Sequence, residues 1–148
     1  MIKQKYNYLL IGCVLVLAVI CFLSVNGPLA FERERAEREK VVEERLLAIQ
    51  QAQNVFCEQQ GHYAETFDVL IRAGLLADSL QYVPYSNQEC FSLHVTVETT
   101  ATGRSVPLME CGASYSQYLN GLDTKAIARL TEEAERLGNY PGIKIGGL

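Results

Sequence analysis

The feature that most constrains this chain is an uncharged apolar run near its N-terminus. Residues Tyr8 to Val25 read YLLIGCVLVLAVICFLSV. As a helix, this run is about long enough to cross the hydrocarbon core of a bilayer. Soluble cores rarely contain so long a stretch without charge, so the run predicts a membrane-spanning helix or a signal sequence. The predicted membrane anchor consists of Tyr8, Leu9, Leu10, Ile11, Val14, Leu15, Val16, Leu17, Val19, Ile20, Phe22 and Leu23.

A cleaved signal peptide is the main alternative to an uncleaved anchor. Lys3 and Lys5 supply a positive n-region ahead of the apolar run. A cut after Ala30 would place Pro28 where a small residue is preferred, so the flanks favour an uncleaved anchor. Lipidation at Cys13 is rejected, because most of the apolar run follows this cysteine instead of preceding it.

Positive residues flank the run on both sides, which bears on its orientation. Lys3 and Lys5 adjoin it, whereas the arginines that start at Arg33 begin several residues beyond it and alternate with glutamates. A short N-terminal tail is also an improbable segment to translocate alone. We therefore predict a cytoplasmic N-terminus, with the rest of the chain on the other side of the membrane.

A long helix is predicted to follow the anchor. Pro28 removes a backbone donor and is expected to kink or interrupt the helix, which then resumes. Residues 31–41 carry Glu and Arg at i,i+4 spacing, typical of a solvated helix with ion pairs. From Val42 an apolar stripe recurs at three- and four-residue steps, and Gly61 ends the helix. The stripe comprises Val42, Leu46, Ile49, Ala52 and Phe56.

The segment GHYAETFDVLIRAGLL, from Gly61 to Leu76, is predicted to fold back over this stripe. A short helix is expected between Thr66 and Ala73, with Phe67, Leu70 and Ile71 facing inward and Gly74 closing it. The residues predicted to pack helix and domain together are Val42, Leu46, Ile49, Phe56, Tyr63, Phe67 and Leu70.

The second half of the chain predicts a small antiparallel sheet and another helix. Residues 90–100 alternate apolar and polar side chains. One face carries Phe91, Leu93, Val95 and Val97, and the other carries Ser92, His94, Thr96 and Glu98. A turn at 101–103 leads to a second strand over 105–113, which Pro107 moves toward a sheet edge or a bulge. A helix is predicted over 122–137, with Asp123 as its N-cap and Gly138 as its stop. The tail from Asn139 is expected to be turn-rich and extended.

These elements define an α+β fold class: a long N-terminal helix on a small antiparallel sheet, with a short helix after it and a C-terminal helix. Three segments are predicted: residues 1–27 as cytoplasmic tip and anchor, residues 28–60 as a charged, then amphipathic stalk, and residues 61–148 as the α+β domain packing on helix 42–58.

Cysteine spacing leaves two alternatives open. Cys90 and Cys111 flank the predicted hairpin, so a disulfide between them is possible. Three free buried thiols, Cys57 included, are the other possibility. No C-x-x-C spacing occurs, so no metal site is predicted.

No catalytic constellation is visible in the sequence. His62 and His94 are the only histidines, and neither has a nucleophile signature nearby. A net charge of −4 and a pI near 5.2 give no basic surface for nucleic acid. We therefore expect a non-enzymatic protein without a cofactor and without a nucleic-acid partner.

The order of elements resembles that of type IV pilins and type II secretion pseudopilins. The stretch AQNVFCEQQGHYAETFDVLIRAGLL is similar to the pseudopilin pattern of a helix end, G-x-Y, a short helix and a glycine. Two stretches, VVEERLLAIQQAQNVFCEQQGHYAETFDVLI and YSQYLNGLDTKAIARLTEEAERLGNYPGIKIG, resemble a group of small single-pass envelope proteins of Bacteroidota. The chain departs from pilins because Cys13 follows Gly12 and no acidic residue precedes Glu32.

This resemblance implies a single-pass protein of a bacterial inner membrane whose C-terminal domain is periplasmic. The leading hypothesis is a structural subunit of an envelope assembly, in which the anchor and stalk contact partner helices and the sheet face carries specificity. Its expected partners are the lipid bilayer and other membrane or periplasmic subunits, including itself. The alternative is a membrane-tethered binding or accessory module that does not polymerise.

Overall fold

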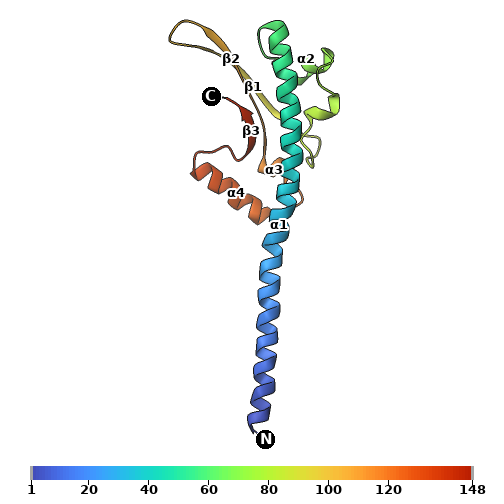
Figure 1. The fold of residues 1–148 in the computed structure, drawn as a ribbon, viewed down its shortest axis with the longest axis vertical. Helices are drawn as coiled ribbons and strands as arrows, with labels where there is room; N and C mark the ends of the chain where they lie inside the picture. Colours follow the sequence, from blue (N-terminus) through green and yellow to red (C-terminus); the bar gives the residue numbers. More distant parts are fainter. Residues whose placement is uncertain (1, 148) are drawn as a thin grey trace. The chain divides into compact units, whose positions relative to one another are not determined.

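The computed structural model describes residues 2–147, with side chains from residue 6 onward, and shows the α+β class predicted from the sequence (Figure 1). A long N-terminal helix, α1 (Ile2–Gln60), contacts a three-stranded antiparallel sheet. Short helices occur later in the chain. The chain divides into two compact units, Met1–Ala36 and Glu37–Leu148. The predicted division at residues 27 and 60 stays a prediction.

Helix α1 is continuous through Pro28, so of the two expected effects the interruption is wrong and the kink stays a prediction. Proline removes one backbone donor from a helix interior, but the remaining hydrogen bonds of a long helix hold its neighbours in place. The predicted stop is confirmed: α1 ends at Gln60, and Gly61 adopts a positive φ of 80° that favours glycine.

The core of the second unit forms along one face of α1. Val42, Leu46 and Ile49 have no exposed surface, and Ala52 and Phe56 are also buried. Burying each large aliphatic or aromatic side chain contributes about 1.5–3 kcal/mol, so this stripe is a major source of the unit's stability. Phe67, Leu70, Phe91, Tyr118 and Leu119 are buried in the same unit.

Two short elements follow α1 before the sheet begins. Helix α2 (Phe67–Arg72) starts after Thr66, whose side chain makes no capping hydrogen bond. Phe67 and Leu70 of this helix are buried as predicted, whereas Ile71 is only half-buried. A single 3₁₀ turn, η1 (Asp78–Gln81), then leads toward the first strand.

Strands β1 (Ser92–Thr99) and β2 (Ser105–Ser114) form the predicted hairpin. Their register is unbroken from Ser92↔Gly112 to Thr99↔Ser105. Pro107 pairs with Val97 in this ladder. Strand β3 pairs with β2 only from Glu110 onward, so the missing proline donor costs no bond there.

The C-terminal tail forms a third strand, β3 (Gly142–Gly146), in place of the expected turn-rich extension. Glycines permit this pairing, because a Cβ at Gly142 would overlap the Ala113 carbonyl oxygen and one at Gly146 would overlap the Met109 carbonyl oxygen. The sheet order is therefore β1-β2-β3, with β2 in the centre.

Two helices connect β2 to β3. Helix α3 (Tyr115–Tyr118) is one turn long and was not predicted. Helix α4 (Thr124–Arg136) agrees with the predicted C-terminal helix, and the Asp123 side chain accepts a hydrogen bond from the Lys125 N–H at 3.0 Å. This N-cap fixes the start of α4 at the predicted residue.

Candidate functional site

The predicted anchor residues lie on every side of α1 in the first unit. The twelve positions from Tyr8 to Leu23 are between 53% and 68% exposed. The most apolar window of the helix has a mean hydropathy of 2.9 and no buried surface. Helix α1 is therefore long and apolar enough to cross a membrane, and a signal sequence near the N-terminus has the same properties.

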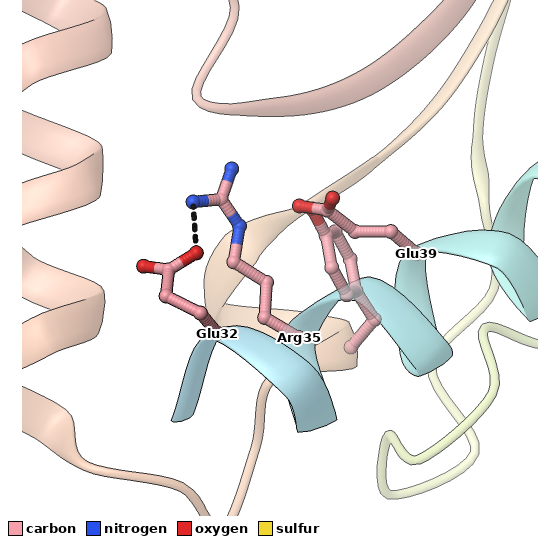
Figure 2. Close-up of polar contacts among 4 residues, drawn as sticks. Glu32, Arg35 and Glu39 are labelled. Atoms are coloured by element: carbon pink, nitrogen blue, oxygen red, sulfur yellow. Dashed lines mark hydrogen bonds and ion pairs between the residues drawn. The ribbon is translucent and has the colours of Figure 1, made fainter. Parts of the chain in front are cut away.

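The charged part of the first unit contains an ion pair between neighbouring turns of α1. Arg35 Nη1 lies 3.6 Å from Glu32 Oε2, at i,i+3 spacing (Figure 2). The Glu32 side chain is 60% exposed, so water screens this pair and it contributes little stability. The Arg35 side chain is only 22% exposed, so it is less solvated than the sequence pattern predicts.

The side chain of Arg38 ties α1 to the loop after α3. Its Nη1 donates to the carbonyl oxygens of Asn120 at 2.8 Å and Tyr118 at 3.2 Å, and its guanidinium lies 4.5 Å from the centre of the Tyr85 ring. The Tyr118 hydroxyl donates to Glu39 Oε1 at 3.2 Å. Arg38, which the sequence pattern predicts to form only solvated ion pairs, therefore holds α1 to the segment after β2.

Two further polar residues of α1 contact the segments that wrap it. Arg45 Nη1 donates to the Tyr82 carbonyl oxygen at 2.8 Å. Gln53 is fully buried, and its amide bonds Ala64 reciprocally: Nε2 donates to the Ala64 oxygen and Oε1 accepts from the Ala64 N–H, both at 2.9 Å. Sequence periodicity missed both residues, because it registers only apolar positions.

The residues predicted to pack helix and domain lie in the second unit. Val42, Leu46, Ile49, Phe56, Phe67 and Leu70 are buried, and Tyr63 is half-buried. His62, which the sequence left in a turn, stacks edge-on against Phe56 with ring centres 5.7 Å apart. Its Nδ1 lies 3.1 Å from the neighbouring Tyr63 carbonyl oxygen. These contacts fix the corner after α1.

The polar face of the sheet brings three charged or titratable side chains together. His94 on β1 lies directly opposite Glu110 on β2, and Lys144 Nζ on β3 lies 3.2 Å from Glu110 Oε1. Beside them is a shallow hollow of about 360 Å³, lined by His94, Thr96, Glu98, Leu108, Glu110 and Gly147. All of these side chains are at least partly accessible, so the face is suited to polar contacts with another molecule.

A second hollow lies beside α4. It has a volume of about 460 Å³ and is lined by residues of α3, of the loop after α3 and of the first part of α4. Ile127, Ala128 and Thr131 contribute apolar surface, and Ser116, Asn120 and Glu132 stand at its sides. The groove combines apolar lining with a few polar groups, as small binding sites do.

The possible disulfide between Cys90 and Cys111 is absent: both residues are free thiols. The strand register explains this correction. Cys111 lies opposite Leu93, three positions along the strand from Cys90. At about 3.3 Å per residue this offset exceeds the Cα separation that a disulfide spans. Cys90 is exposed and Cys111 is buried, so the expectation of buried thiols is wrong at Cys90, and the two thiols differ in environment.

We expect the two thiols to react very differently. Burial raises the pKa of the Cys111 thiol from 9.0 to about 12, so this thiol stays protonated at neutral pH and is shielded from reagents. At pH 8 a maleimide is expected to modify Cys90 in the folded protein and Cys111 only after unfolding. Peptide mass spectrometry of labelled samples measures this, and equal rates at both residues would contradict the placement of Cys111.

The same pKa shift gives a pH dependence with a definite sign. The folded-state pKa lies above the unfolded one, so the unfolded chain loses its proton first as the pH rises. The contribution of Cys111 to stability is therefore complete below about pH 9. Above this pH the contribution is expected to fall as the pH rises toward 12. Urea unfolding followed across this range measures the fall as a loss of unfolding free energy. The loss is expected to be smaller in Cys111→Ala.

Within residues 2–147, no group of three or more His, Cys, Asp or Glu side chains is arranged to hold a metal ion. No protein-family model matches the chain, and neither does any curated protein sequence or solved structure. Three features of the structure therefore bear on the role of the protein: an exposed apolar helix segment, a polar sheet face and a groove beside α4.

Proposed function

We propose that this protein is a non-enzymatic structural subunit of a bacterial envelope assembly, held in the membrane by an uncleaved N-terminal helix. One observation carries this proposal. Helix α1 supplies the apolar segment exposed on all sides and also the stripe on which the α+β domain is built. A long apolar N-terminal helix packed against a small three-stranded antiparallel sheet is compatible with a pilin-like architecture.

The proposed location follows from the charges around the anchor. With Lys3 and Lys5 on the cytoplasmic side, the domain after α1 lies in the periplasm. The lipid bilayer is then the first partner, because it covers the apolar segment. Other membrane or periplasmic subunits, including further copies of the chain, are proposed to contact the polar sheet face. Nucleic acid is not among the proposed partners, given the net charge of −4.

A second candidate function is favoured by the groove beside α4. Its apolar lining and volume of about 460 Å³ suit a side chain or a small apolar group of a partner. In this alternative the protein is a membrane-tethered binding or accessory module that does not polymerise. The proposal assigns no catalytic role, because the sequence shows no nucleophile signature near His62 or His94.

Mass spectrometry of the mature protein tests the anchor, and native size tests the assembly. We expect the mature chain to start at Met1 and to remain in the membrane fraction; a start at Phe31 would overturn the anchor. In detergent extracts and after crosslinking in native membranes, we expect species larger than one copy. A strictly monomeric protein without crosslinked partners would instead favour the tethered binding module.

A further inference from the structure

Strand β1 has an outer edge whose backbone groups have no hydrogen-bond partner in the described part of the chain. The Thr100 N–H donates to the Arg104 carbonyl oxygen at 2.8 Å, and hydrogen-bonded pairs recur at every second position of an antiparallel ladder. The even-numbered residues of β1 therefore direct their backbone groups toward β2. The N–H and C=O groups of residues 93, 95, 97 and 99 point away from the sheet.

The other free backbone of the sheet is protected against a further strand. Strand β3 carries Lys144 at its centre, and Gly146 at its end has a φ of 81°. Where the hairpin extends beyond β3, β2 carries Pro107, which has no N–H to offer (Figure 1). Lysines, irregular ends and prolines keep edges from pairing. Strand β1 is eight residues long and regular in register, without proline, lysine or glycine, so it is the edge suited to strand addition.

The apolar face of β1 is incompletely covered next to this edge. Val97 is 62% exposed, and Leu93 and Val95 on the same face are half-buried. A strand added beside β1 would lie about 4.8 Å away, with its alternate side chains on this face. Apolar residues at those alternate positions would cover Val97 and remove its apolar surface from water.

The polar face of β1 borders the hollow of about 360 Å³, which contains the carboxylates of Glu98 and Glu110 and the apolar side chain of Leu108. Lys144 Nζ already pairs with Glu110 at 3.2 Å. Glu98 is exposed and makes no hydrogen bond or ion pair with any other residue that the structure describes. The charge complementary to this edge is therefore positive. A basic side chain from an added strand could lay its stem over Leu108 and bring its charge to Glu98.

We propose that the β1 edge binds, antiparallel, an extended segment of another envelope subunit in which apolar and basic residues alternate. This inference rests on the proposed function and names one of its partners. The apolar residues of the segment lie opposite Val95 and Val97 and exchange backbone hydrogen bonds with them. The basic residues lie opposite Thr96 and Glu98, at the pairs where side chains approach most closely.

An extended segment suits this edge better than a second copy of the domain. A second copy that added its own β1 antiparallel would reverse the helical residues 37–60 that run alongside these strands, whereas a segment of another protein has no such constraint (Figure 1). In strand addition the main-chain bonds supply affinity, and the alternate side chains supply specificity. Both contributions are available along β1.

Peptide binding to the full chain in a nonionic detergent tests the chemistry of the segment. The probe is a labelled peptide of roughly seven residues, a common strand length, in which valine and arginine alternate. The control peptide has the same composition with its arginines adjacent, so it keeps the charge and loses the alternation. Fluorescence polarisation is expected to show binding of the control weaker by about tenfold or more.

Methylation of the peptide backbone tests the direction of the added strand without changing the protein. In antiparallel addition the valine N–H groups face β1 and the arginine N–H groups face away. N-methylation of the inner valines should therefore weaken binding about tenfold or more, whereas N-methylation of the arginines should change it less than about twofold. Parallel addition would reverse this order.

Substitutions in the protein test the charge and backbone contacts separately. Glu98→Gln should weaken binding of the alternating peptide about threefold, and Glu133→Gln, which removes an exposed charge from α4, should leave it nearly unchanged. Val97→Pro removes an outward N–H that β2 does not use and should weaken binding about tenfold or more. Protection of Cys111 from maleimide shows whether this variant keeps its fold. If Cys111 becomes reactive, the methylated peptides decide the backbone contact.

The outcomes separate this inference from the proposed function. Equal binding of the alternating and control peptides overturns the inference, as does equal binding of the two methylated peptides. A disulfide-linked dimer of Thr96→Cys would place a second copy at this edge and overturn it as well. In each case crosslinked partners of the wild-type chain would leave the assembly standing on another surface. Expected peptide binding without any crosslinked partner in native membranes would overturn the assembly and leave β1 as the binding edge of a tethered module.

Discussion

Replacing Gln53 by glutamate is expected to destabilise the domain by about 3 kcal/mol or more at pH 7. Gln53 is fully buried, and its amide both donates to and accepts from the backbone of Ala64 at 2.9 Å. A carboxylate at this position accepts from the Ala64 N–H but cannot donate to the Ala64 oxygen. The substitution therefore buries a charge and leaves a carbonyl without its donor.

The destabilisation by Gln53→Glu is expected to shrink in acid. Burial raises the folded-state pKa of the introduced carboxyl above its unfolded value of about 4.3. Below this value the carboxyl is neutral in both states and donates to Ala64 as the amide does. The loss of stability grows as the pH rises through the unfolded pKa, and it is complete above the folded one.

Urea unfolding of Gln53→Glu and wild type at pH 4 and pH 7 measures this effect. Gln51→Glu is the matched control, because Gln51 is exposed two residues away on the same helix. The control is expected to change the free energy of unfolding by less than about 0.5 kcal/mol at either pH. A loss of stability at Gln53 that is independent of pH would show that the reciprocal bond to Ala64 does not form.

Two arginines in the centre of the apolar run are expected to abolish membrane retention. Each arginine at the middle of a spanning helix costs about 2.5–3.5 kcal/mol of insertion free energy. Leu15→Arg with Val16→Arg places both charges midway along the predicted anchor, where neither side chain easily reaches an interface. The fraction of protein that stays in the membrane pellet after alkaline carbonate extraction should fall from most to little of the total.

The matched control places the same charges at the end of the run. In Val25→Arg with Asn26→Arg, both side chains extend to the headgroups, so retention should change little. Equal retention of the two double variants would show that the run does not cross the bilayer. Equal loss of both would show that added charge, wherever it lies, releases the chain. Neither result is compatible with an anchor centred on residues 15 and 16.

Patterns local to the chain predicted much of the fold. The apolar stripe of α1 has helical periodicity, and the alternation before Thr99 has the period of a strand; each pattern reflects which side of an element meets the core. Gly61 and Asp123 marked the end of α1 and the start of α4 through backbone conformation and capping, which depend on a few neighbouring residues.

The missed features depend on residues far apart in the chain. Strand β3 carries a weak pattern of its own and forms because Gly142 and Gly146 let it approach β2 closely. Arg38 and Gln53 looked like ordinary helix residues, and their partners Asn120 and Ala64 are fixed only when the chain folds back. The register, set by the hairpin turn, excludes the disulfide that spacing had left open.

The sequence by itself determined that the chain has an apolar segment, a long helix with one buried stripe and a small antiparallel sheet. Those properties follow from solvation and local backbone preference, which act residue by residue. Only the tertiary structure decided which edge of the sheet stays open and which polar groups of α1 are satisfied inside the domain. Hydrogen bonds and strand order join residues distant in sequence, so no local pattern encodes the unpaired β1 edge with Val97, His94 and Glu98 along it.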